Sequence, residues 1–346
     1  MSPVPWSDPA REQAFAQWLA DQAARHGLRP ASLRIASADA SFRRYLRVDA
    51  ADGGTRIVMD APPPQEDCRP FVHVAGLMAD AGLHVPTVIE SDLAQGFVLL
   101  EDLGSRLYLD ALREADDAQA DALMREAITA LVQLQSRGDA SSLAPYDEAL
   151  LTRELELFPT WCVEREHGIV WSDAERAQWQ ALSRRLIDSA LAQPTVLVHR
   201  DWMPRNLMIA APNPGVLDFQ DAVRGPITYD VASLLRDAFW SWDEAREIDW
   251  AVRYWQQARS DGLPVDADFG EFWRQLEWMG LQRHLKVLGI FCRLKHRDGK
   301  PRYATDVPRF FAYAIKVATR YAPLAPLVRL IEPMSGSLTS SAFTLR

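Results

Sequence analysis

The stretch Val198–Asp218, V-H-R-D-W-M-P-R-N-L-M-I-A-A-P-N-P-G-V-L-D, decides how this chain folds and what chemistry it can carry. Its apolar runs predict a strand over 195–198, a turn at the tripeptide H-R-D, and a second short strand that ends at Asp218. Asp201 stands at the apex of the turn, where its carboxylate can accept the proton of an attacking hydroxyl group. The amide oxygen of Asn206 and the carboxylate of Asp218 are hard oxygen ligands of the kind that Mg²⁺ prefers.

The spacing H-R-D-x-x-x-x-N, followed by an Asp at the end of a strand, is typical of the phosphoryl-transfer site of protein-kinase-like enzymes. It predicts Asp201 as the catalytic residue, Asn206 and Asp218 as Mg²⁺ ligands, and ATP as the phosphoryl donor. A second H-R-D, at 296–298, has no preceding strand and no Asn five residues later, so we expect it only to end a long helix. Asp230 stands at the predicted start of a helix, and we expect it to be structural and to hold the catalytic loop in place.

Length and composition fit a globular chain of two domains. The 346 residues are 48% hydrophobic and 25% charged, and domains average about 150 residues. The net charge of −9 argues against a nucleic acid or an anionic membrane as a partner, and no apolar run approaches the ~20 residues of a membrane span. Because residues 1–8 lack a secretory signal pattern, we expect a cytoplasmic protein, and no protein partner is implied. Cys68, Cys162 and Cys292 are odd in number and far apart in sequence, which indicates neither a disulfide framework nor a zinc site.

The first part of the chain has the pattern of a small lobe built on an antiparallel sheet. Periodicity and turn residues predict, in order, a helix over 9–27, strands over 32–36, 42–49 and 55–60, a helix over 69–81, and strands over 85–90 and 96–100. We therefore expect residues 1–102 to form an N-terminal nucleotide-binding lobe with a leading helix.

From residue 103 onward, helical periodicity predominates. Helices are predicted over 106–137, 147–166, 173–191, 228–240, 243–260, 268–297 and 306–321. Residues 103–330 should form a C-terminal catalytic and substrate lobe, and the small polar residues near the end predict a flexible tail over 331–346. The expected fold class is α+β, a two-lobed protein-kinase-like fold with an antiparallel sheet in the smaller lobe.

Three motifs resemble the aminoglycoside/choline phosphotransferase family, which are small-molecule kinases with a protein-kinase-like fold. They are V-H-R-D-W-M-P-R-N-L, G-V-L-D-F-Q-D, and G-P-I-T-Y-D-V-A at 225–232, in that order. Longer runs such as S-A-D-A-S-F-R-R-Y (37–45), V-M-D-A-P-P-P-Q-E-D-C-R-P-F (58–71) and H-R-D-G-K-P-R-Y (296–303) resemble one bacterial branch of that family. The resemblance implies phosphorylation by ATP of the anomeric C1 hydroxyl of N-acetylmuramate and N-acetylglucosamine, which feeds peptidoglycan recycling.

The predicted nucleotide site departs from the kinase pattern. The loop 37–41 contains no glycine, and no lysine precedes Lys286, so the usual lysine anchor for the phosphates is absent. Arginine can clamp phosphate oxygens in its place, and Arg43 and Arg44 are the best candidates. Because side chains alternate along a strand, we expect one of the two to point into the nucleotide cleft. Ser41 could give a hydroxyl or a backbone N–H to a phosphate.

Two further sets of contacts follow from the resemblance or from neighbouring positions. The resemblance implies that backbone groups of Glu101 and Leu103, in a hinge-like segment, meet the adenine. N-acetylmuramate carries a lactyl carboxylate that a basic group should meet. The candidate substrate residues are Arg205, which adjoins Asn206; Arg224; Arg283; and Trp202, which either stacks on a sugar ring or lies in the lobe interior.

Two alternatives to an amino-sugar kinase remain open. The same fold could act on an aminoglycoside, a choline-like compound or another hydroxyl acceptor. A pseudokinase that only binds nucleotide is suggested by the missing lysine and glycines. The presence together of Asp201, Asn206 and Asp218 argues against the pseudokinase, because a scaffold does not need a complete metal site.

Overall fold

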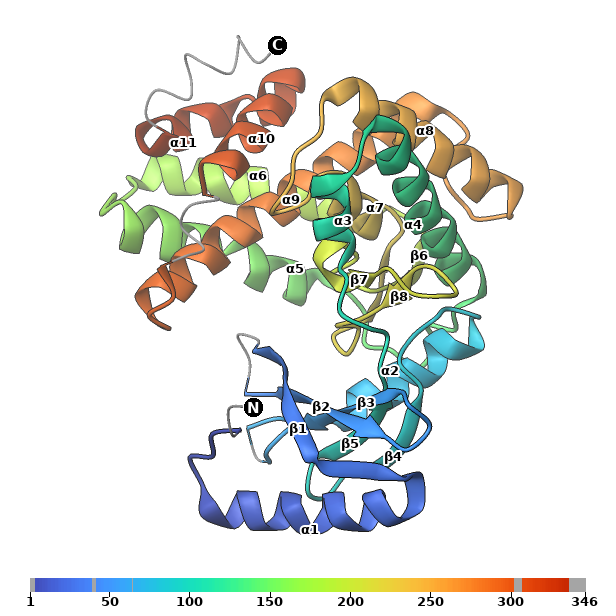
Figure 1. Ribbon diagram of the computed structural model, residues 1–346. Coiled ribbons are helices and arrows are strands. Elements are labelled where there is room, and N and C mark those ends of the chain that lie inside the picture. Colours follow the sequence, from blue (N-terminus) through green and yellow to red (C-terminus); the bar gives the residue numbers. More distant parts are fainter. Residues whose placement is uncertain (1–3, 39–41, 64, 302–306, 336–346) are drawn as a thin grey trace. The chain divides into compact units, whose positions relative to one another are not determined.

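The computed structural model describes residues 4–38, 42–63, 65–301 and 307–335 (Figure 1). These residues form two compact units. The first joins the chain up to Glu114 with the later segment Arg205–Asp221, and the second joins Ala115–Pro204 with the chain from Ala222 onward. The predicted boundary at residue 102 therefore lies within the first unit. That unit also contains the later segment that carries Asn206 and Asp218.

The first unit is built on a five-stranded antiparallel sheet with the strand order β1-β2-β3-β5-β4. The strands are β1 (Leu28–Ala38), β2 (Arg44–Ala50), β3 (Thr55–Asp60), β4 (Val88–Asp92) and β5 (Phe97–Glu101). The helices of this unit are α1 (Pro9–His26), α2 (Arg69–Asp80) and α3 (Tyr108–Glu114). The sheet predicted for this part of the chain is confirmed, with β3 at its predicted bounds.

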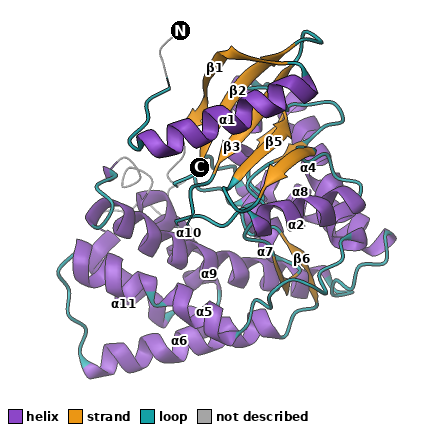
Figure 2. Cartoon of the chain, turned by 90° about the horizontal axis from the view of Figure 1, so that it is seen from below, coloured by secondary structure: helices purple, strands orange, loops and turns teal. Residues whose placement is uncertain are grey.

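Helix α1 lies across one face of this sheet (Figure 2). It begins where the side chain of Asp8 accepts a hydrogen bond from the N–H of Ala10, and it ends at Gly27, whose φ of 64° is left-handed. Its buried face places Phe15 and Trp18 against Phe97 of β5, with ring centroids 5.5 Å apart in both pairs. The leading helix is thus part of the core of the first unit.

A short ladder brings the segment 205–221 into the first unit. Strand β7 (Leu207–Met208) pairs with β8 (Gly215–Val216), directly after a 3₁₀ turn at Pro204–Asn206. The N–H of Val216 donates to the carbonyl of His84 at 2.8 Å. A Cβ at position 215 would lie 2.8 Å from the Cδ1 of Leu103, so a larger residue there would require the leucine side chain to shift.

The second unit is mostly helical. Its helices are α4 (Asp117–Arg137), α5 (Glu148–Leu155), a π-helical segment (Phe158–Glu166), α6 (Asp173–Leu191), α7 (Tyr229–Leu235), α8 (Glu244–Ser260), α9 (Phe269–His296), α10 (Val307–Arg320), a 3₁₀ turn (Ala322–Leu324) and α11 (Pro326–Ser335). Two short strands, β6 (Thr195–Val198) and β9 (Val223–Pro226), form an antiparallel ribbon. Helix α9 is largely buried and packs against the π-helical segment, α10, α7 and α6.

Several predicted elements differ from the structure. The helix predicted over 106–137 is two helices, because Asp116 and Gln119 form a reciprocal capping box that starts α4. The helix predicted over 147–166 divides into α5 and the π-helical segment. The strand predicted to end at Asp218 ends at Val216. Strand β9 was not predicted.

The predicted tail is also wrong in its first residues, since 331–335 belong to helix α11. The rest of that predicted tail, 336–346, lies outside the described residues. Helix α9 ends at His296, as expected from the second H-R-D tripeptide. In the described part of the chain, no helix has the length and apolar character that a membrane crossing requires. The three cysteines are buried thiols without disulfide partners.

Candidate active site

The catalytic loop follows β6 in the second unit, and hydrogen bonds to Asp230 hold its backbone in place. The carboxylate of Asp230, fully buried at the start of α7, accepts the N–H of His199 at 2.6 Å and the N–H of Arg200 at 3.0 Å. Burial raises the pKa of Asp230 to about 7, and the two N–H donors act in the opposite direction. The structural role predicted for Asp230 is therefore confirmed.

Arg200 has an unusual backbone conformation, with φ of 75°. The left-handed region costs a non-glycine residue about 1–3 kcal/mol, so surrounding contacts must hold Arg200 there. Two are visible: its N–H bonds to Asp230, and its Nη2 lies 2.6 Å from Oε1 of Glu154. The turn places the next residue, Asp201, with 42% of its side chain exposed. A carboxylate that is exposed at the apex of a fixed loop is suited to meet a hydroxyl substrate.

The residues around Asp201 form the base of the loop. His199 is fully buried, and its ring packs edge-on against Trp202 with the centroids 5.5 Å apart. Trp202 is itself completely buried, so the interior position is the one observed and its ring does not offer a face to a sugar. Behind the loop, Nη2 of Arg283 on α9 lies 4.0 Å from Oδ1 of Asp201.

The predicted metal ligands lie side by side within the first unit. Nδ2 of Asn206 is 3.5 Å from Oδ2 of Asp218, and the N–H of Leu217 donates to the carbonyl of Asn206 at 2.9 Å. Asp218 has φ of 62°, and its Oδ1 accepts a hydrogen bond from Gln220 at 2.8 Å. Phe219, which follows Asp218, is fully buried and packs on Phe71 with ring centroids 4.8 Å apart. Phe219 thus anchors this segment in the core, and Asp218 lies beside Asn206.

This pair fits Mg²⁺. The ion takes oxygen ligands, keeps several waters and is usually held by one or two carboxylates together with substrate phosphates. One carboxylate and one amide oxygen on a short loop meet that requirement. Sequence reasoning did not single out Gln220, whose amide orients the carboxylate of Asp218.

Both candidate phosphate clamps are engaged in ion pairs within the first unit. Nε of Arg43 donates to Oε2 of Glu66 at 3.0 Å. Arg44 forms a two-pronged pair with the buried Asp60, and its guanidinium lies 3.9 Å above the ring centroid of Trp6. Either arginine would have to exchange a carboxylate for a phosphate, so the clamp stays a prediction. Ser41 lies outside the described residues.

The hinge-like segment is firmly tied to the sheet. The N–H of Glu101 donates to the carbonyl of Thr87 at 2.9 Å, and its carboxylate accepts the hydroxyl of Thr87 at 2.8 Å. Asp102 accepts a bidentate pair from Arg47, and Leu103 is buried. The N–H of Glu101 is thus used within the sheet, and the predicted adenine contacts of this segment are untested.

The remaining substrate candidates differ in exposure. Arg205 is half-buried directly before Asn206. Arg224 is exposed on β9, where its backbone bonds to Ala144 and Tyr146. Arg283 is 2% exposed, and its Nε and Nη1 have no hydrogen-bond partner.

A buried charge cluster around Glu154 was missed by sequence reasoning. Oε1 of Glu154 contacts Arg200 and lies 2.8 Å from Nζ of Lys286, while Oε2 accepts the hydroxyl of Tyr146 and the amide of Gln282. Burial acts to raise the pKa of Glu154, but Lys286 and Arg200 outweigh it and lower the pKa below its usual value. One signal was available: Glu154 stands on the apolar face of α5, beside Leu151 and Leu155.

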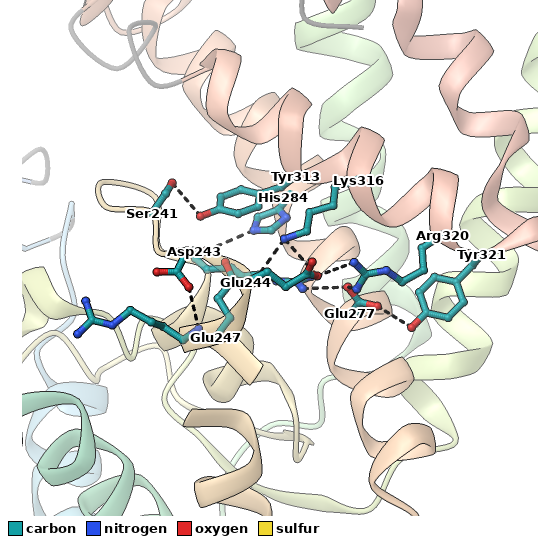
Figure 3. A network of polar contacts seen from close by, with 12 residues as sticks. Ser241, Asp243, Glu244, Glu247, Glu277, His284, Tyr313, Lys316, Arg320 and Tyr321 are labelled. Carbon is teal, nitrogen blue, oxygen red and sulfur yellow. Dashed lines mark hydrogen bonds and ion pairs between the residues drawn. The ribbon is translucent and has the colours of Figure 1, made fainter. Parts of the chain in front are cut away.

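A second cluster with similar chemistry lies around Glu277 in the same unit (Figure 3). Oε1 of Glu277 is 2.9 Å from Nη2 of Arg236 and 2.6 Å from Nη1 of Arg320, and Oε2 accepts the hydroxyl of Tyr321 at 2.6 Å. Arg236 also contacts Glu247 at 3.2 Å. These residues come from the C-terminal end of α7, from α8, α9 and α10, and from the residue after α10, so the cluster links these helices.

Comparison with known proteins places the chain in a family. Residues 32–269 match the phosphotransferase enzyme family. The N-acetylmuramate/N-acetylglucosamine kinase of Pseudomonas putida is 57% identical over 303 residues, which cover 88% of each chain. The protein of the same name from Pseudomonas aeruginosa is 52% identical, covering 88% of this chain and 89% of the relative. That from Neisseria meningitidis is 47% identical, with coverages of 88% and 91%.

Solved structures support the fold. An ADP-bound aminoglycoside phosphotransferase has a TM-score of 0.60 at 13% identity and covers 87% of this chain and 98% of its own. An ethanolamine kinase from Plasmodium vivax has a TM-score of 0.58 at 10% identity and covers 84% of each chain. The expected two-lobed protein-kinase-like fold is confirmed. With a family match over most of its length and relatives above 45% identity, the chain belongs to the phosphotransferase enzyme family.

Proposed function

We propose that this protein transfers the γ-phosphoryl group of ATP to the anomeric C1 hydroxyl of N-acetylmuramate and N-acetylglucosamine. The names and identities of the relatives support the two sugars. The observation that carries the chemistry is the half-exposed carboxylate of Asp201, at the apex of a loop whose backbone is bonded to the buried Asp230. The product would be a sugar 1-phosphate, which can feed nucleotide-sugar synthesis during peptidoglycan recycling in the cytoplasm.

In this proposal Asp201 orients the sugar hydroxyl and receives its proton. The oxygen of the hydroxyl forms a bond to the γ-phosphorus, the bond from that phosphorus to the bridging oxygen breaks, and ADP leaves. Because the transition state is loose, early deprotonation contributes little and positioning contributes most. A carboxylate fixed on a rigid loop satisfies that requirement.

Asn206 and Asp218 would hold Mg²⁺ through the amide oxygen of one and the carboxylate of the other. When bound, the ion neutralises charge on the triphosphate. Gln220 would keep the Asp218 carboxylate oriented through its 2.8 Å hydrogen bond. Asn206 follows Asp201 by five residues in the sequence.

Nucleotide and sugar contacts complete the proposal. We assign the phosphate clamp to Arg43 or Arg44 and the adenine contacts to the backbone around Glu101 and Leu103. A basic residue near Asp201 would meet the lactyl carboxylate of N-acetylmuramate, for which Arg205, Arg224 and Arg283 are candidates.

The test is a turnover assay with Mg²⁺–ATP in which the release of ADP is measured. The acceptors are N-acetylmuramate, N-acetylglucosamine, glucosamine, choline and kanamycin. We expect turnover with the two N-acetylated sugars and little with the other three. Turnover only with choline or kanamycin would overturn the substrate and keep the reaction. Nucleotide binding without turnover on the whole panel would contradict the assignment as an amino-sugar kinase.

A further inference from the structure

We propose that Glu154 is a positioning residue for phosphoryl transfer: through Arg200 it keeps the catalytic loop in the conformation that presents Asp201. The inference rests on the proposed role of Asp201. It assigns a catalytic consequence to a side chain that lies on a helix well outside the H-R-D segment in sequence.

The contacts link Glu154 to the loop directly. Its Oε1 lies 2.6 Å from Nη2 of Arg200, the residue that precedes Asp201 and has the left-handed φ of 75°. The carboxylate of Asp230 accepts the backbone N–H of Arg200, and the carboxylate of Glu154 pairs with the guanidinium of Arg200. Two carboxylates thus hold the same residue, one through its backbone and one through its side chain. A residue in a sparsely populated conformation persists only when several contacts impose it.

The second cation of the cluster fixes Glu154 itself. Nζ of Lys286 lies 2.8 Å from Oε1 and donates to the hydroxyl of Tyr229 at 3.0 Å. The hydroxyl of Tyr146 and the amide of Gln282 donate hydrogen bonds to Oε2 of Glu154. With both oxygens engaged, the carboxylate has little freedom to turn away from Arg200.

Helix packing sets this arrangement in register. One turn beyond Glu154 and Lys286 stand Leu157 and Gly289, and a Cβ at 289 would lie only 2.4 Å from the carbonyl carbon of Leu157. Helix α9 therefore approaches the end of α5 at a distance that only glycine permits. This close approach brings the lysine of one helix to the glutamate of the other.

The cluster needs the negative charge of Glu154 to hold Arg200 in place. Glu154 is 4% exposed and Lys286 is 9% exposed, so water can replace little of what either group would lose. Neutral glutamine at 154 would leave Lys286 and Arg200 facing each other across a buried site. Arg200 would be repelled from its present position, and Asp201 would move with it.

The experiment compares Glu154→Gln with the matched variant Glu277→Gln. Glu277 is a buried carboxylate of the same unit that also meets two cations and a tyrosine hydroxyl but does not contact the loop. We expect Glu154→Gln to lower kcat about 10²-fold with both Michaelis constants unchanged, the effect of a misplaced catalytic group. Glu277→Gln should leave kcat at the wild-type value, even if it lowers the melting temperature as much as Glu154→Gln does.

A second readout does not depend on the acceptor. In the wild-type protein, the amides of His199 and Arg200 should be protected from hydrogen exchange because they donate to Asp230. Glu154→Gln should remove that protection, and Glu277→Gln should not. If the proposed sugars prove wrong, this measurement still tests the inference by itself.

Glu154→Asp covers the case in which Glu154→Gln does not fold. It keeps the negative charge between the two cations but is one methylene too short to reach Arg200 in its present place. A loss of both kcat and amide protection in Glu154→Asp would support the inference. Wild-type kcat and protection in either folded Glu154 variant, or equal loss of kcat in Glu277→Gln, would overturn it.

Discussion

Glu154 and Glu277 are buried carboxylates of the second unit with nearly the same surroundings. In each, Oε1 meets an arginine and a second cation, and Oε2 accepts a tyrosine hydroxyl. They differ in what the arginine belongs to. Arg200 precedes Asp201 in the catalytic loop, whereas Arg236 follows α7 and pairs with Glu247 of α8 and Glu277 of α9.

Two buried charge clusters with the same chemistry can therefore have different roles in one fold. The energetics of the two clusters should be alike, because burial and partners are alike. The consequence for catalysis depends on whether the clamped residue moves a reacting group. Stability and turnover measurements should therefore separate the two sites.

Asp201→Ala tests whether the residue next to the Glu154 cluster is the catalytic one. We expect turnover to fall by about 10³-fold or more, because the sugar hydroxyl loses the group that orients it and accepts its proton. Melting temperature and Mg²⁺–ATP affinity should stay near wild type. Asp298→Ala, in the second H-R-D, is the matched control and should keep full activity; a normal rate in Asp201→Ala would refute the assignment.

Asp218→Asn tests the proposed metal site, whose two ligands lie in the first unit. Loss of the carboxylate charge should lower kcat/KM about 10²-fold and raise the Mg²⁺ concentration needed for half-maximal rate. Chelation by EDTA should likewise stop turnover of the wild-type protein and leave its melting temperature unchanged. Full activity of the wild-type protein after chelation and dialysis would contradict the metal assignment.

Denaturant unfolding of Glu154→Gln and Glu277→Gln tests the likeness of the two clusters. Removing one partner of a buried charge group costs about 3–5 kcal/mol, so both variants should lose a similar amount of unfolding free energy. A much smaller loss for Glu154→Gln would mean that the two clusters are not energetic equivalents. Their comparison as matched sites would then fail.

Arg43→Ala and Arg44→Ala ask whether an ion-paired arginine in the first unit can serve the nucleotide. One of them should raise the Michaelis constant for ATP about tenfold, the worth of one charged hydrogen bond. Since Arg44 is bound to the buried Asp60, its replacement should also lower the melting temperature. An unchanged Michaelis constant for ATP in both variants would contradict the arginine clamp.

His284 gives the smallest expected effect and borders the second cluster. Its ring stacks on Tyr313 with the centroids 4.6 Å apart, and burial, then Arg236 and Arg283, hold its pKa well below the usual value. Below about pH 6.5 the unfolded chain binds a proton that the folded protein does not, so stability should fall as the pH decreases. His284→Phe should lose this part of the pH dependence, by up to about 1.4 kcal/mol per pH unit. Identical pH slopes for the two proteins would contradict it.

The sequence predicted the fold and the chemical residues well because both leave local patterns. Alternating strands in the first unit and the H-R-D-x-x-x-x-N spacing depend on neighbours within a few positions. The break between α3 and α4 was missed although the capping box at Asp116 and Gln119 is also local, because the apolar pattern continues across it. Helix α11 was missed because the small polar residues near the end of the chain predicted a tail that began too early, at residue 331.

The contacts that hold the site could not be predicted because they join distant segments. Glu154 meets Lys286 across 132 positions of sequence (286 − 154), and only the tertiary packing of α5 on α9 brings them together. The partners of Arg43 and Arg44 likewise depend on which carboxylates the folded sheet places beside them. Period and spacing show that a residue is buried or reactive, but they do not show which charge it meets.

The most direct measurement is the position of phosphorus on the sugar after reaction with N-acetylmuramate and Mg²⁺–ATP. A two-dimensional ³¹P–¹H NMR spectrum of the product correlates the phosphate with the proton on the carbon that bears it. We expect a correlation to the anomeric proton, H1. A correlation to the C6 protons, or to any ring proton other than H1, would contradict the proposed anomeric kinase.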